Sequence, residues 1–473
     1  MNILHVSAEC YPVAKVGGLG DVAGALPKYQ TKQGHTAMLV MPMYKTAFLD
    51  KHEWDVVHKG QATLGDYLFN FTVIREKTQT LGFDLYQVDI NGLLDRPKVY
   101  GYQDDPQRFI AFQTAVATWL ESWKTPPDIV HCHDYHTGLL PFFFKYGYAF
   151  RKLEKVPTVL TVHNAEYQGW LDWSHSNWLP AFDEWKSGLL EWNKTINPLA
   201  SAIKNAWAVT TVSPSYLVEL RYQSNGLEAL FEYEKGKCSG ILNGIDAELW
   251  NPETDVLTDS HYSLKTVTKG KLENKKAVAA NFGLNADRPL FTFIGRLVGE
   301  KAADLLPDSL AAFLREQDGK VNVLVLGSGE PEIEAGLQGL KGYFPGSYDF
   351  YKGYSEKLSH QLYAGADFLL MPSRVEPCGL NQMYALRYGT VPLVRRVGGL
   401  KDTITDIGDG GNGLCFDQAS VGDILMTLNR ALDLYQDPKR LESLRKKMMQ
   451  IDHSWEKTVS AYSDLYTTLL IKK

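Results

Sequence analysis

Near the start of the chain, residues 3–29 read ILHVSAECYPVAKVGGLGDVAGALPKY, which is an apolar run, a glycine-rich loop and a segment with helical spacing. A buried strand, a loop and a returning helix form the repeating unit of parallel α/β folds. Similar apolar runs, each ending in small or polar residues, follow at 38–41, 128–130, 158–162, 208–212, 290–294, 321–326, 349–351, 367–371 and 391–394. The sequence therefore predicts an α/β protein with buried parallel sheets.

Length, charge and cysteine usage narrow the class of protein. The 473 residues are enough for two or three domains. The 49 Lys and Arg against 55 Asp and Glu leave a net charge of −6, so no global basic field attracts nucleic acid or an anionic membrane. The five cysteines form no CxxC pair, and no run of about 18 apolar residues occurs. We expect a cytoplasmic protein with no membrane segment and no nucleic-acid partner.

The apolar runs fall into two series that are separated near residue 245. There the dipeptide Asn243-Gly244 is a turn signal, and Pro252 breaks both the strand and the helix periodicity. We therefore expect two α/β units. The end of the chain predicts a helix with one packed face, because apolar and aromatic side chains recur there at helical spacing. These side chains are Trp455, Val459, Tyr462, Leu465 and Tyr466.

The first candidate site is the loop with Lys15, Gly17 and Gly18. Glycines let the backbone approach a ligand, a helix start presents N–H groups, and a lysine adds a point charge. The loop therefore predicts a local anion site, with a flexible turn as the alternative. Gly18-x-Gly20-x-x-Ala23 also matches a loose dinucleotide pattern. No acidic residue follows the second strand to bind a ribose, which argues against an NAD-dependent dehydrogenase.

Two polar motifs follow apolar strands in the first half, at His131-Cys132-His133-Asp134 and at His163. Ligands of open α/β sheets bind at the carboxyl ends of the strands. The histidines suggest a metal, but they lack a defined ligand set, and structural hydrogen bonding is the stronger alternative for His131 and His133. Asp134 is the better functional candidate. His163 either serves the structure or donates a hydrogen bond to a substrate hydroxyl or carbonyl.

Charged residues follow two strands in the second half. Arg296 offers a fork for two phosphate oxygens, and Lys301, five residues later, brings a second positive charge. Glu376 lies just before a helix start that Pro377 and Gly379 shape, and the N–H groups there can receive phosphate. Surface ion pairs and stabilisation of the helix dipole are the alternatives. Together these residues predict a clamp for a diphosphate.

With these motifs in view, the sequence resembles the bacterial glycogen synthase and plant starch synthase family over essentially the whole chain. The motifs that carry the resemblance are KVGGLGD at 15–21, HDYHTGL at 133–139, HNAEYQG at 163–169, ILNGID at 241–246, the Arg296 and Lys301 spacing, EPCGL at 376–380 and YALRYGT at 384–390. So many motifs in the family's order leave no room for chance similarity.

The resemblance implies a GT-B fold, in which two Rossmann-like domains face each other across a deep cleft and a C-terminal helix crosses back to the N-terminal domain. The N-terminal domain would be residues 1–245, on the acceptor side. Residues 246–450 would bind the nucleotide sugar, and residues 451–473 would form the returning helix. The implied reaction is retaining transfer of glucose from ADP-glucose to the non-reducing end of an α-1,4-glucan, which elongates glycogen.

Carried over by position, the resemblance also implies roles for individual residues. The catalytic residues would be Asp134, His163, Arg296, Lys301 and Glu376. The donor-binding residues would be Lys15, Gly17, Gly18, Arg296, Lys301, Glu376, Cys378, Gly379 and Leu380. We expect no metal and no other cofactor. The chain has no Asp-x-Asp motif, and two fixed cations with helix N-termini can neutralise the charge that develops on the diphosphate.

Two alternatives remain within this resemblance. In the first, the donor would be UDP-glucose. In the second, the protein would be a catalytically weakened glucan-binding homologue, but the presence of Lys15, His163, Arg296, Lys301 and Glu376 together argues against this. The chain also departs from the family's pattern. Ala302 stands where a Gly usually follows Lys301, Ala200 stands where a Lys is usual, and the segment 170–192 carries five Trp. These departures bear on acceptor handling and donor preference.

Overall fold

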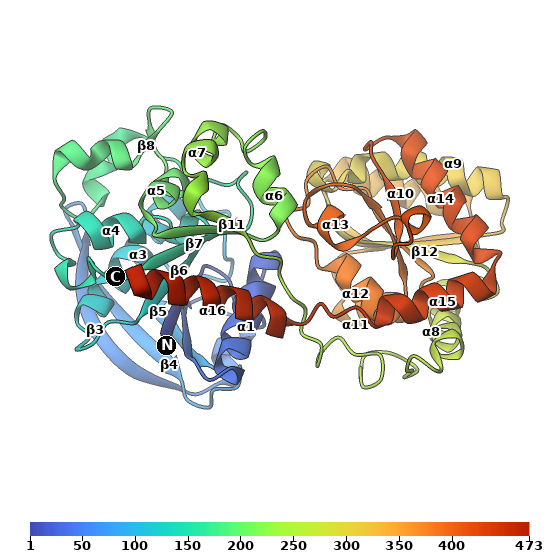
Figure 1. Ribbon diagram of the computed structural model, residues 1–473, viewed down its shortest axis with the longest axis horizontal. Helices are drawn as coiled ribbons and strands as arrows, with labels where there is room; N and C mark the ends of the chain where they lie inside the picture. The colour runs from blue at the N-terminus through green and yellow to red at the C-terminus, as the bar shows by residue number, and fades with distance from the viewer. Residues whose placement is uncertain (473) are drawn as a thin grey trace. The chain divides into compact units, whose positions relative to one another are not determined.

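The computed structural model describes residues 1–472, and the chain forms two compact units. The first unit comprises Met1–Asn243 and the C-terminal segment that begins at Trp455, and the second comprises Gly244–Ser454. The limits expected from the sequence are 245/246 and 450/451. Each unit has its own largely parallel sheet flanked by helices (Figure 1), so the predicted α/β class is confirmed.

The first unit is built on a sheet whose described strands run in the order β11-β10-β7-β6-β1-β2-β5-β4-β3. Neighbouring strands from β11 to β5 are parallel, whereas β4 is antiparallel to both β5 and β3. The bounds are β1 Asn2–Val6, β2 Thr36–Pro42, β3 Trp54–Leu64, β4 Tyr67–Glu76, β5 Asp84–Asp89, β6 Ile129–His133, β7 Thr158–Val162, β10 Ala208–Thr211 and β11 Cys238–Gly240. A separate antiparallel pair is β8 Glu191–Trp192 and β9 Thr195–Ile196.

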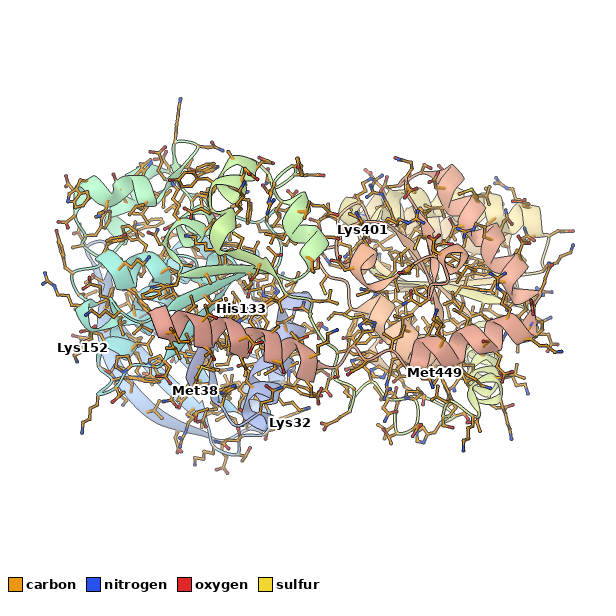
Figure 2. The ribbon with its side chains drawn as sticks, viewed as in Figure 1. Lys32, Met38, His133, Lys152, Lys401 and Met449 are labelled. Carbon is orange, nitrogen blue, oxygen red and sulfur yellow. The ribbon has the colours of Figure 1, made fainter. Side chains whose placement is uncertain are left out.

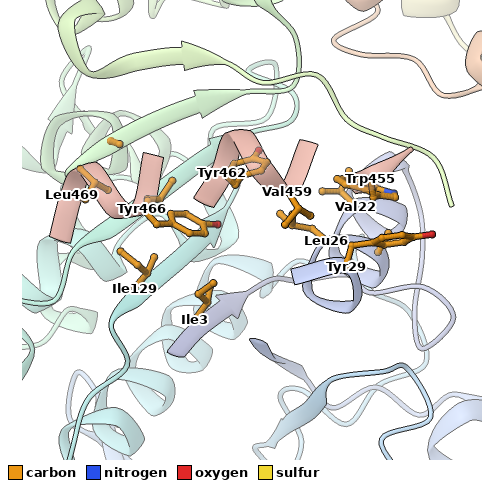
Figure 3. Close-up of a cluster of buried hydrophobic side chains, with 13 residues drawn as sticks. Ile3, Val22, Leu26, Tyr29, Ile129, Trp455, Val459, Tyr462, Tyr466 and Leu469 are labelled. Carbon is orange, nitrogen blue, oxygen red and sulfur yellow. The ribbon is translucent and has the colours of Figure 1, made fainter. Parts of the chain in front are cut away.

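The helices of the first unit include the C-terminal helix, which packs on the sheet of this unit, as the family resemblance implies. They are α1 Gly18–Lys32, α2 Ala47–Lys51, α3 Asp105–Glu121, α4 Leu140–Tyr146, α5 Pro198–Asn205, α6 Pro214–Glu219, α7 Glu228–Tyr233 and α16 Trp455–Lys472. Trp455, Val459, Tyr462 and Tyr466 of α16 form one buried cluster with α1, β1 and β6 (Figure 3). Burial of this aromatic face attaches the end of the chain to its beginning.

The second unit has a fully parallel sheet in the order β14-β13-β12-β15-β16-β17. Its strands are β12 Leu290–Leu297, β13 Asn322–Gly329, β14 Tyr348–Lys352, β15 Phe368–Met371, β16 Val391–Arg395 and β17 Leu414–Phe416. Its helices are α8 Val267–Phe282, α9 Leu306–Gln317, α10 Pro331–Tyr343, α11 Glu356–Gly365, α12 Asn381–Tyr388, α13 Gly398–Thr403, α14 Val421–Tyr435 and α15 Pro438–Met449.

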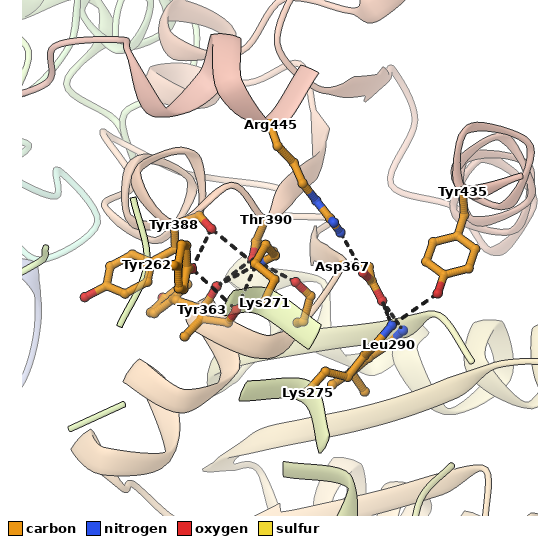
Figure 4. Close-up of polar contacts among 12 residues, drawn as sticks. Tyr262, Lys271, Lys275, Leu290, Tyr363, Asp367, Tyr388, Thr390, Tyr435 and Arg445 are labelled. Atoms are coloured by element: carbon orange, nitrogen blue, oxygen red, sulfur yellow. Dashed lines mark hydrogen bonds and ion pairs between the residues drawn. The ribbon is translucent and has the colours of Figure 1, made fainter. Parts of the chain in front are cut away.

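A buried ionic cluster joins elements of the second unit (Figure 4). Asp367, at the start of β15, lies 3.0 Å from Lys275 Nζ of α8 and 2.6 Å from Arg445 Nη2 of α15. Its carboxylate also accepts a hydrogen bond of 2.8 Å from the backbone N–H of Leu290. Beside it, the Lys271 ammonium is 2% exposed and donates to three backbone carbonyls and to Thr390. Charge pairing thus fixes α8 and α15 against the sheet.

Several strands of the structure were not predicted from the sequence. The long hairpin of β3 and β4 is half-exposed and rich in polar residues, so it gives no continuous apolar run. The strands β11 and β17 have three residues each, too few for periodicity to show. Within residues 1–472, no helix combines the length and the apolar character needed to cross a membrane.

Candidate functional site

The loops after β6 and β7 place Asp134 next to His163 in the first unit. The two strands are parallel neighbours, with His133 opposite Thr161, so both loops leave the sheet at the same edge. Asp134 Oδ1 accepts a hydrogen bond of 2.7 Å from the backbone N–H of His163. Both residues are 8% exposed. The structure therefore brings these two predicted site residues together.

Burial sets the protonation of this pair. It raises the pKa of Asp134 to about 7, although the backbone N–H groups of His163 and Asn164 act in the opposite direction. It lowers the pKa of His163 to about 3, so the imidazole is neutral at neutral pH. Asp134 also has φ of +56°, an uncommon backbone conformation for a non-glycine residue. A carboxyl group near half-protonation and a neutral imidazole can both exchange hydrogen bonds with sugar hydroxyls.

The glycine loop of the first unit is held by Glu9, a residue that the sequence analysis missed. Glu9 Oε2 accepts hydrogen bonds from the backbone N–H groups of Val16 and Gly17, at 2.6 and 3.0 Å. Glu9 Oε1 accepts a hydrogen bond of 2.8 Å from the hydroxyl of Tyr100. The side chain is 3% exposed. Its place three residues after the first strand was the one signal that could have pointed to it.

Lys15 and Gly17 lie in the loop that leads into α1, and Gly18 is the first residue of that helix. Lys15 Nζ lies 2.7 Å from Asp21 Oδ1, and the lysine side chain is 33% exposed. A Cβ atom added at Gly17 or Gly18 would meet nothing within 4 Å, so packing inside the unit does not require glycine at either position. The residue before α1, Gly17, has no side chain with which to cap the helix. The open space at Gly17 and Gly18, beside a helix N-terminus and Lys15, suits an anionic ligand.

In the second unit, Lys301 and Glu376 form a tight ion pair. They follow β12 and β15, which are parallel neighbours. Lys301 Nζ lies 2.6 Å from each carboxylate oxygen of Glu376, and the hydroxyl of Ser373 donates to Glu376 Oε2 at 2.8 Å. Glu376 is 6% exposed. An ammonium group has three N–H donors, so Lys301 can hold Glu376 and still donate to a ligand.

Arg296 lies within β12, which continues to Leu297 and so passes the Ile294 end expected from the sequence, and it does not join the ion pair. Its Nη2 lies 3.4 Å from Glu300 Oε2, and its side chain is 48% exposed. A long contact at such exposure is weak, so the guanidinium can turn toward an anion at little cost. Ala302, which stands where the family usually has glycine, has φ of +51°. The loop therefore keeps the left-handed conformation that glycine adopts most easily.

The residues Cys378, Gly379 and Leu380 immediately precede α12, which begins at Asn381. The side-chain amide of Asn381 donates to the carbonyl of Ile294 at 2.8 Å, which attaches the start of α12 to β12. The helix N-terminus thus lies close to the end of the strand that leads to Arg296 and Lys301. This arrangement brings the predicted donor-binding segment of the second unit to one edge of its sheet.

Two further glycines shape the loop that carries Glu376. A Cβ atom at Gly398 would lie 2.0 Å from the carbonyl oxygen of Glu376, and one at Gly399 would lie 2.0 Å from the carbonyl oxygen of Cys378. Gly398 also has φ of +47°. The start of α13 can therefore approach this loop only because both residues lack a side chain. The sequence shows them as a glycine turn at a strand end but does not show what they contact.

A pocket in the first unit adjoins the loop after β6. Its lining includes Phe109, Tyr135, Leu139, Gly169, Trp170 and Pro198. Trp170 belongs to the tryptophan-rich segment 170–192 and is 51% exposed. Ala200, where the family usually has lysine, is fully buried in α5. The pocket presents apolar and aromatic faces next to Asp134, which suits a polyhydroxylated ring with one apolar face.

Comparison of the chain with known proteins identifies its family. Residues 2–233 match the family model "Starch synthase catalytic domain", and residues 274–448 match "Glycosyl transferases group 1". The chain is 50% identical over 473 residues to a glycogen synthase of Flavobacterium johnsoniae, and the match covers all of both chains. It is 39% identical to a glycogen synthase of Streptococcus pneumoniae, with 99% of this chain and 100% of the relative covered.

Solved structures agree with these matches. The catalytic domain of starch synthase IV from Arabidopsis thaliana, bound to ADP and acarbose, superposes with a TM-score of 0.91 and 32% identity, over 99% of each chain. Sucrose-phosphate synthase of Thermosynechococcus elongatus gives a TM-score of 0.63 at 17% identity, over 100% of this chain and 99% of the other, and shows the shared GT-B fold. The chain is a glycosyltransferase with two α/β domains and belongs to the glycogen and starch synthase family.

Proposed function

We propose that this protein transfers glucose from ADP-glucose to the non-reducing end of an α-1,4-glucan, with retention of the anomeric configuration. The observation that carries the proposal is the full-length similarity to glycogen synthases. The likeness to a starch synthase domain bound to ADP supports the choice of nucleotide, because ADP is what remains when glucose leaves ADP-glucose. The charged groups of the two units supply the chemistry that such a transfer needs.

The second unit would bind the diphosphate. Breaking the bond between sugar and phosphate leaves negative charge on the departing diphosphate, and cations placed there stabilise the transition state more than the bound donor. Lys301 is held in position by Glu376, and Arg296 can turn toward the same group. The N–H groups at the start of α12 would add partial positive charge. In this proposal, these groups act without a divalent metal ion.

Glu376, fixed by Lys301 and Ser373, can accept hydrogen bonds from glucose hydroxyls and orient the ring. Asp134 and His163 would line the sugar pocket from the first unit. Lys15 and the loop with Gly17 and Gly18 would face the donor, and the pocket beside Trp170 would hold part of the glucan. Cys378, Gly379 and Leu380 would bind the donor through their backbone.

The choice of nucleotide is tested by a comparison of donors. Initial rates of glucose incorporation into a glucan primer, measured with ADP-glucose and UDP-glucose over a range of concentrations, should give a kcat/KM at least about tenfold higher for ADP-glucose, which corresponds to about 1.4 kcal/mol. A higher kcat/KM with UDP-glucose would reassign the donor. Incorporation from neither donor would support a catalytically weakened glucan-binding homologue instead.

The contact of Gly398 with the Glu376 loop is tested by a pair of alanine substitutions. Gly398→Ala should displace the loop, because the new Cβ would collide with the carbonyl oxygen of Glu376, and kcat/KM for the donor should fall by about tenfold or more. Gly410→Ala is the matched control. Gly410 has φ of +73°, so it meets similar backbone strain, but its added Cβ would meet nothing within 4 Å. Equal losses in both variants would show that strain alone is responsible.

A further inference from the structure

A chain of buried polar side chains runs from His163 to the C-terminal helix α16. It contains four histidines, His5, His131, His133 and His163, of which His133 is labelled in Figure 2. The first three are fully buried, and so are Gln30 and Tyr466, which continue the chain. Tyr466 extends from α16 toward β1 and β6, the strands that carry His5, His131 and His133 (Figure 3). Among these residues, His163 alone belongs to the candidate site.

A metal ion is one explanation for the cluster, because ligand atoms of His5, His131 and His133 lie within 4.8 Å of one another. Both ring nitrogens of each histidine, however, already have a hydrogen-bond partner. The partners are His133 and Gln30 for His5, Tyr466 and Thr161 for His131, and His5 and His163 for His133. A metal would have to displace these bonds, so the cluster is better explained as a hydrogen-bond chain.

We assign the direction of the chain from its far end, where a backbone carbonyl can only accept. The hydroxyl of Thr210 donates to the carbonyl of Leu160 at 3.3 Å. Either hydroxyl could donate in the 2.6 Å contact between Thr210 and Thr161; we assign Thr161 as the donor, because the hydrogen of Thr210 is then directed at the carbonyl of Leu160. Thr161 must then accept from His131 Nε2–H, at 2.6 Å. His131 therefore carries its proton on Nε2.

The donors and acceptors at Tyr466 of α16 and at Gln30 can be assigned in the same way. Burial lowers the pKa of His131 well below its usual value, so the ring is neutral and its Nδ1 accepts from the Tyr466 hydroxyl at 2.7 Å. Tyr466 must then accept from the side-chain N–H of Gln30, at 3.3 Å. The carbonyl oxygen of Gln30 is left to face His5 Nε2, at 2.7 Å, and it can only accept. His5 therefore also carries its proton on Nε2.

The last two steps reach the candidate site. Burial lowers the pKa of His5 to about 4, so this ring is neutral and its Nδ1 accepts from His133 Nε2–H at 3.0 Å. Burial keeps His133 neutral as well, and its Nδ1 accepts from His163 Nε2–H at 3.0 Å. His163 is then left with an unprotonated Nδ1, for which residues 1–472 offer no hydrogen-bond partner.

We propose that Tyr466 is a positioning residue for His163: through Gln30, His5 and His133 it fixes the tautomer of His163, so that Nδ1 accepts a hydrogen bond from a hydroxyl of the transferred sugar. The proposal rests on the proposed function for the presence of a sugar, but the tautomer does not depend on it. His163 thus acts as an acceptor, whereas the sequence predicts a donor. The hydroxyl of the bound sugar supplies the proton of this bond.

The tautomer is tested by NMR on protein with ¹⁵N-labelled histidine. Long-range ¹H–¹⁵N correlations distinguish the two neutral tautomers, and the spectrum of His163→Ala identifies the His163 signals among the twelve histidines. The wild type should show His163 protonated on Nε2. In Tyr466→Phe, Gln30 can face His5 with either end, because each orientation leaves one amide group unpaired. His163 should then show a mixture of both tautomers.

Tyr462→Phe is the matched control. Tyr462 lies one turn earlier on α16 and is also fully buried, but its hydroxyl contacts Thr161 at 3.4 Å and is not a link between His131 and Gln30. This variant should keep the single tautomer of His163. If Tyr466→Phe fails to fold, Gln30→Met removes the next link and should give the same mixture. A wild-type His163 protonated on Nδ1, or a stoichiometric Zn²⁺ retained by the purified protein, would overturn the proposal.

Kinetics separate this proposal from the proposed function. Tyr466→Phe should lower kcat/KM for glucosyl transfer by about twofold, since about half of the molecules then hold the wrong tautomer. In a His163→Ala background the same substitution should have no further effect, because Tyr466 acts through His163. An additive loss would show a merely structural role and overturn the proposal. A wild-type protein that transfers no glucose, yet shows the expected tautomer, would refute the proposed function and leave the hydrogen-bond chain intact.

Discussion

Lys301→Met is expected to lower kcat/KM for glucosyl transfer by roughly 10²- to 10³-fold, which is the usual cost of losing one group that stabilises charge in a transition state. The substitution also leaves the carboxylate of Glu376 buried without its cation, although Ser373 still donates to it. The unpaired carboxylate of Glu376 would then repel the diphosphate, whereas at present it holds Lys301 in position to bind that group. Initial rates at varied ADP-glucose measure the loss.

Lys341→Met is the control for this substitution. Lys341 also pairs with a carboxylate at 2.6 Å, but it lies in the last turn of α10, which returns the chain to the opposite edge of the sheet. Its replacement should leave kcat/KM within about twofold of the wild type, because exposed ion pairs contribute little. A Lys301→Met enzyme as active as Lys341→Met would remove Lys301 from the catalytic machinery and with it the diphosphate clamp.

Asp367→Asn is expected to destabilise the second unit by about 3–5 kcal/mol, because it leaves two buried cations without a counter-charge. The cations are Lys275 and Arg445, which now lie 3.0 and 2.6 Å from the Asp367 carboxylate. Hydrogen exchange followed by mass spectrometry measures the effect on each unit separately. Peptides from 244–454 should lose protection, while those from the first unit should keep it.

The exposed Asp433 of α14 provides the control, since Asp433→Asn should change protection in the second unit by no more than about 0.5 kcal/mol. The pH dependence gives an independent check. Burial alone would raise the pKa of Asp367, but Lys275 and Arg445 outweigh it and lower that pKa below 3.8. The contribution of Asp367 is therefore fully present above pH 3.8 and is lost as the pH falls further. A stability difference from Asp367→Asn that persists unchanged in acid would contradict the ionic account.

The buried strands and the candidate residues near them could be predicted from the sequence, because the physical cause of each pattern lies within a short segment. Buried parallel strands must be continuously apolar, so β1, β6, β7 and β12 stand out in the sequence. Asp134, His163, Arg296, Lys301 and Glu376 could be chosen as candidates because each lies at the carboxyl end of such a strand or in the loop after it. The half-exposed hairpin of β3 and β4 has no such constraint and was missed. The role of each candidate residue stays a prediction until it is substituted.

Contacts between residues far apart in the sequence could not be predicted from it. Glu9 holds the glycine loop with an oxygen shared by two backbone N–H groups and meets Tyr100 from ninety-one residues away. Gln30 meets Tyr466 across 436 residues. The sequence marked Tyr466 only as one of several aromatic residues on a packed helix face. Nothing in the spacing of α16 distinguishes a tyrosine whose hydroxyl completes a buried polar chain from one that only fills space.

The sequence by itself determined that the chain forms two α/β units, that functional groups follow the strands, and that the family is that of glycogen and starch synthases. Patterns of burial and the order of motifs are properties of short segments, so they can be recognised in the sequence without the structure. Only the tertiary structure decided that Lys301 pairs with Glu376, that Asp134 accepts from the backbone of His163, and that α16 reaches His163 through buried side chains. Hydrogen bonds depend on positions to within a fraction of an ångström, and folding alone sets those positions.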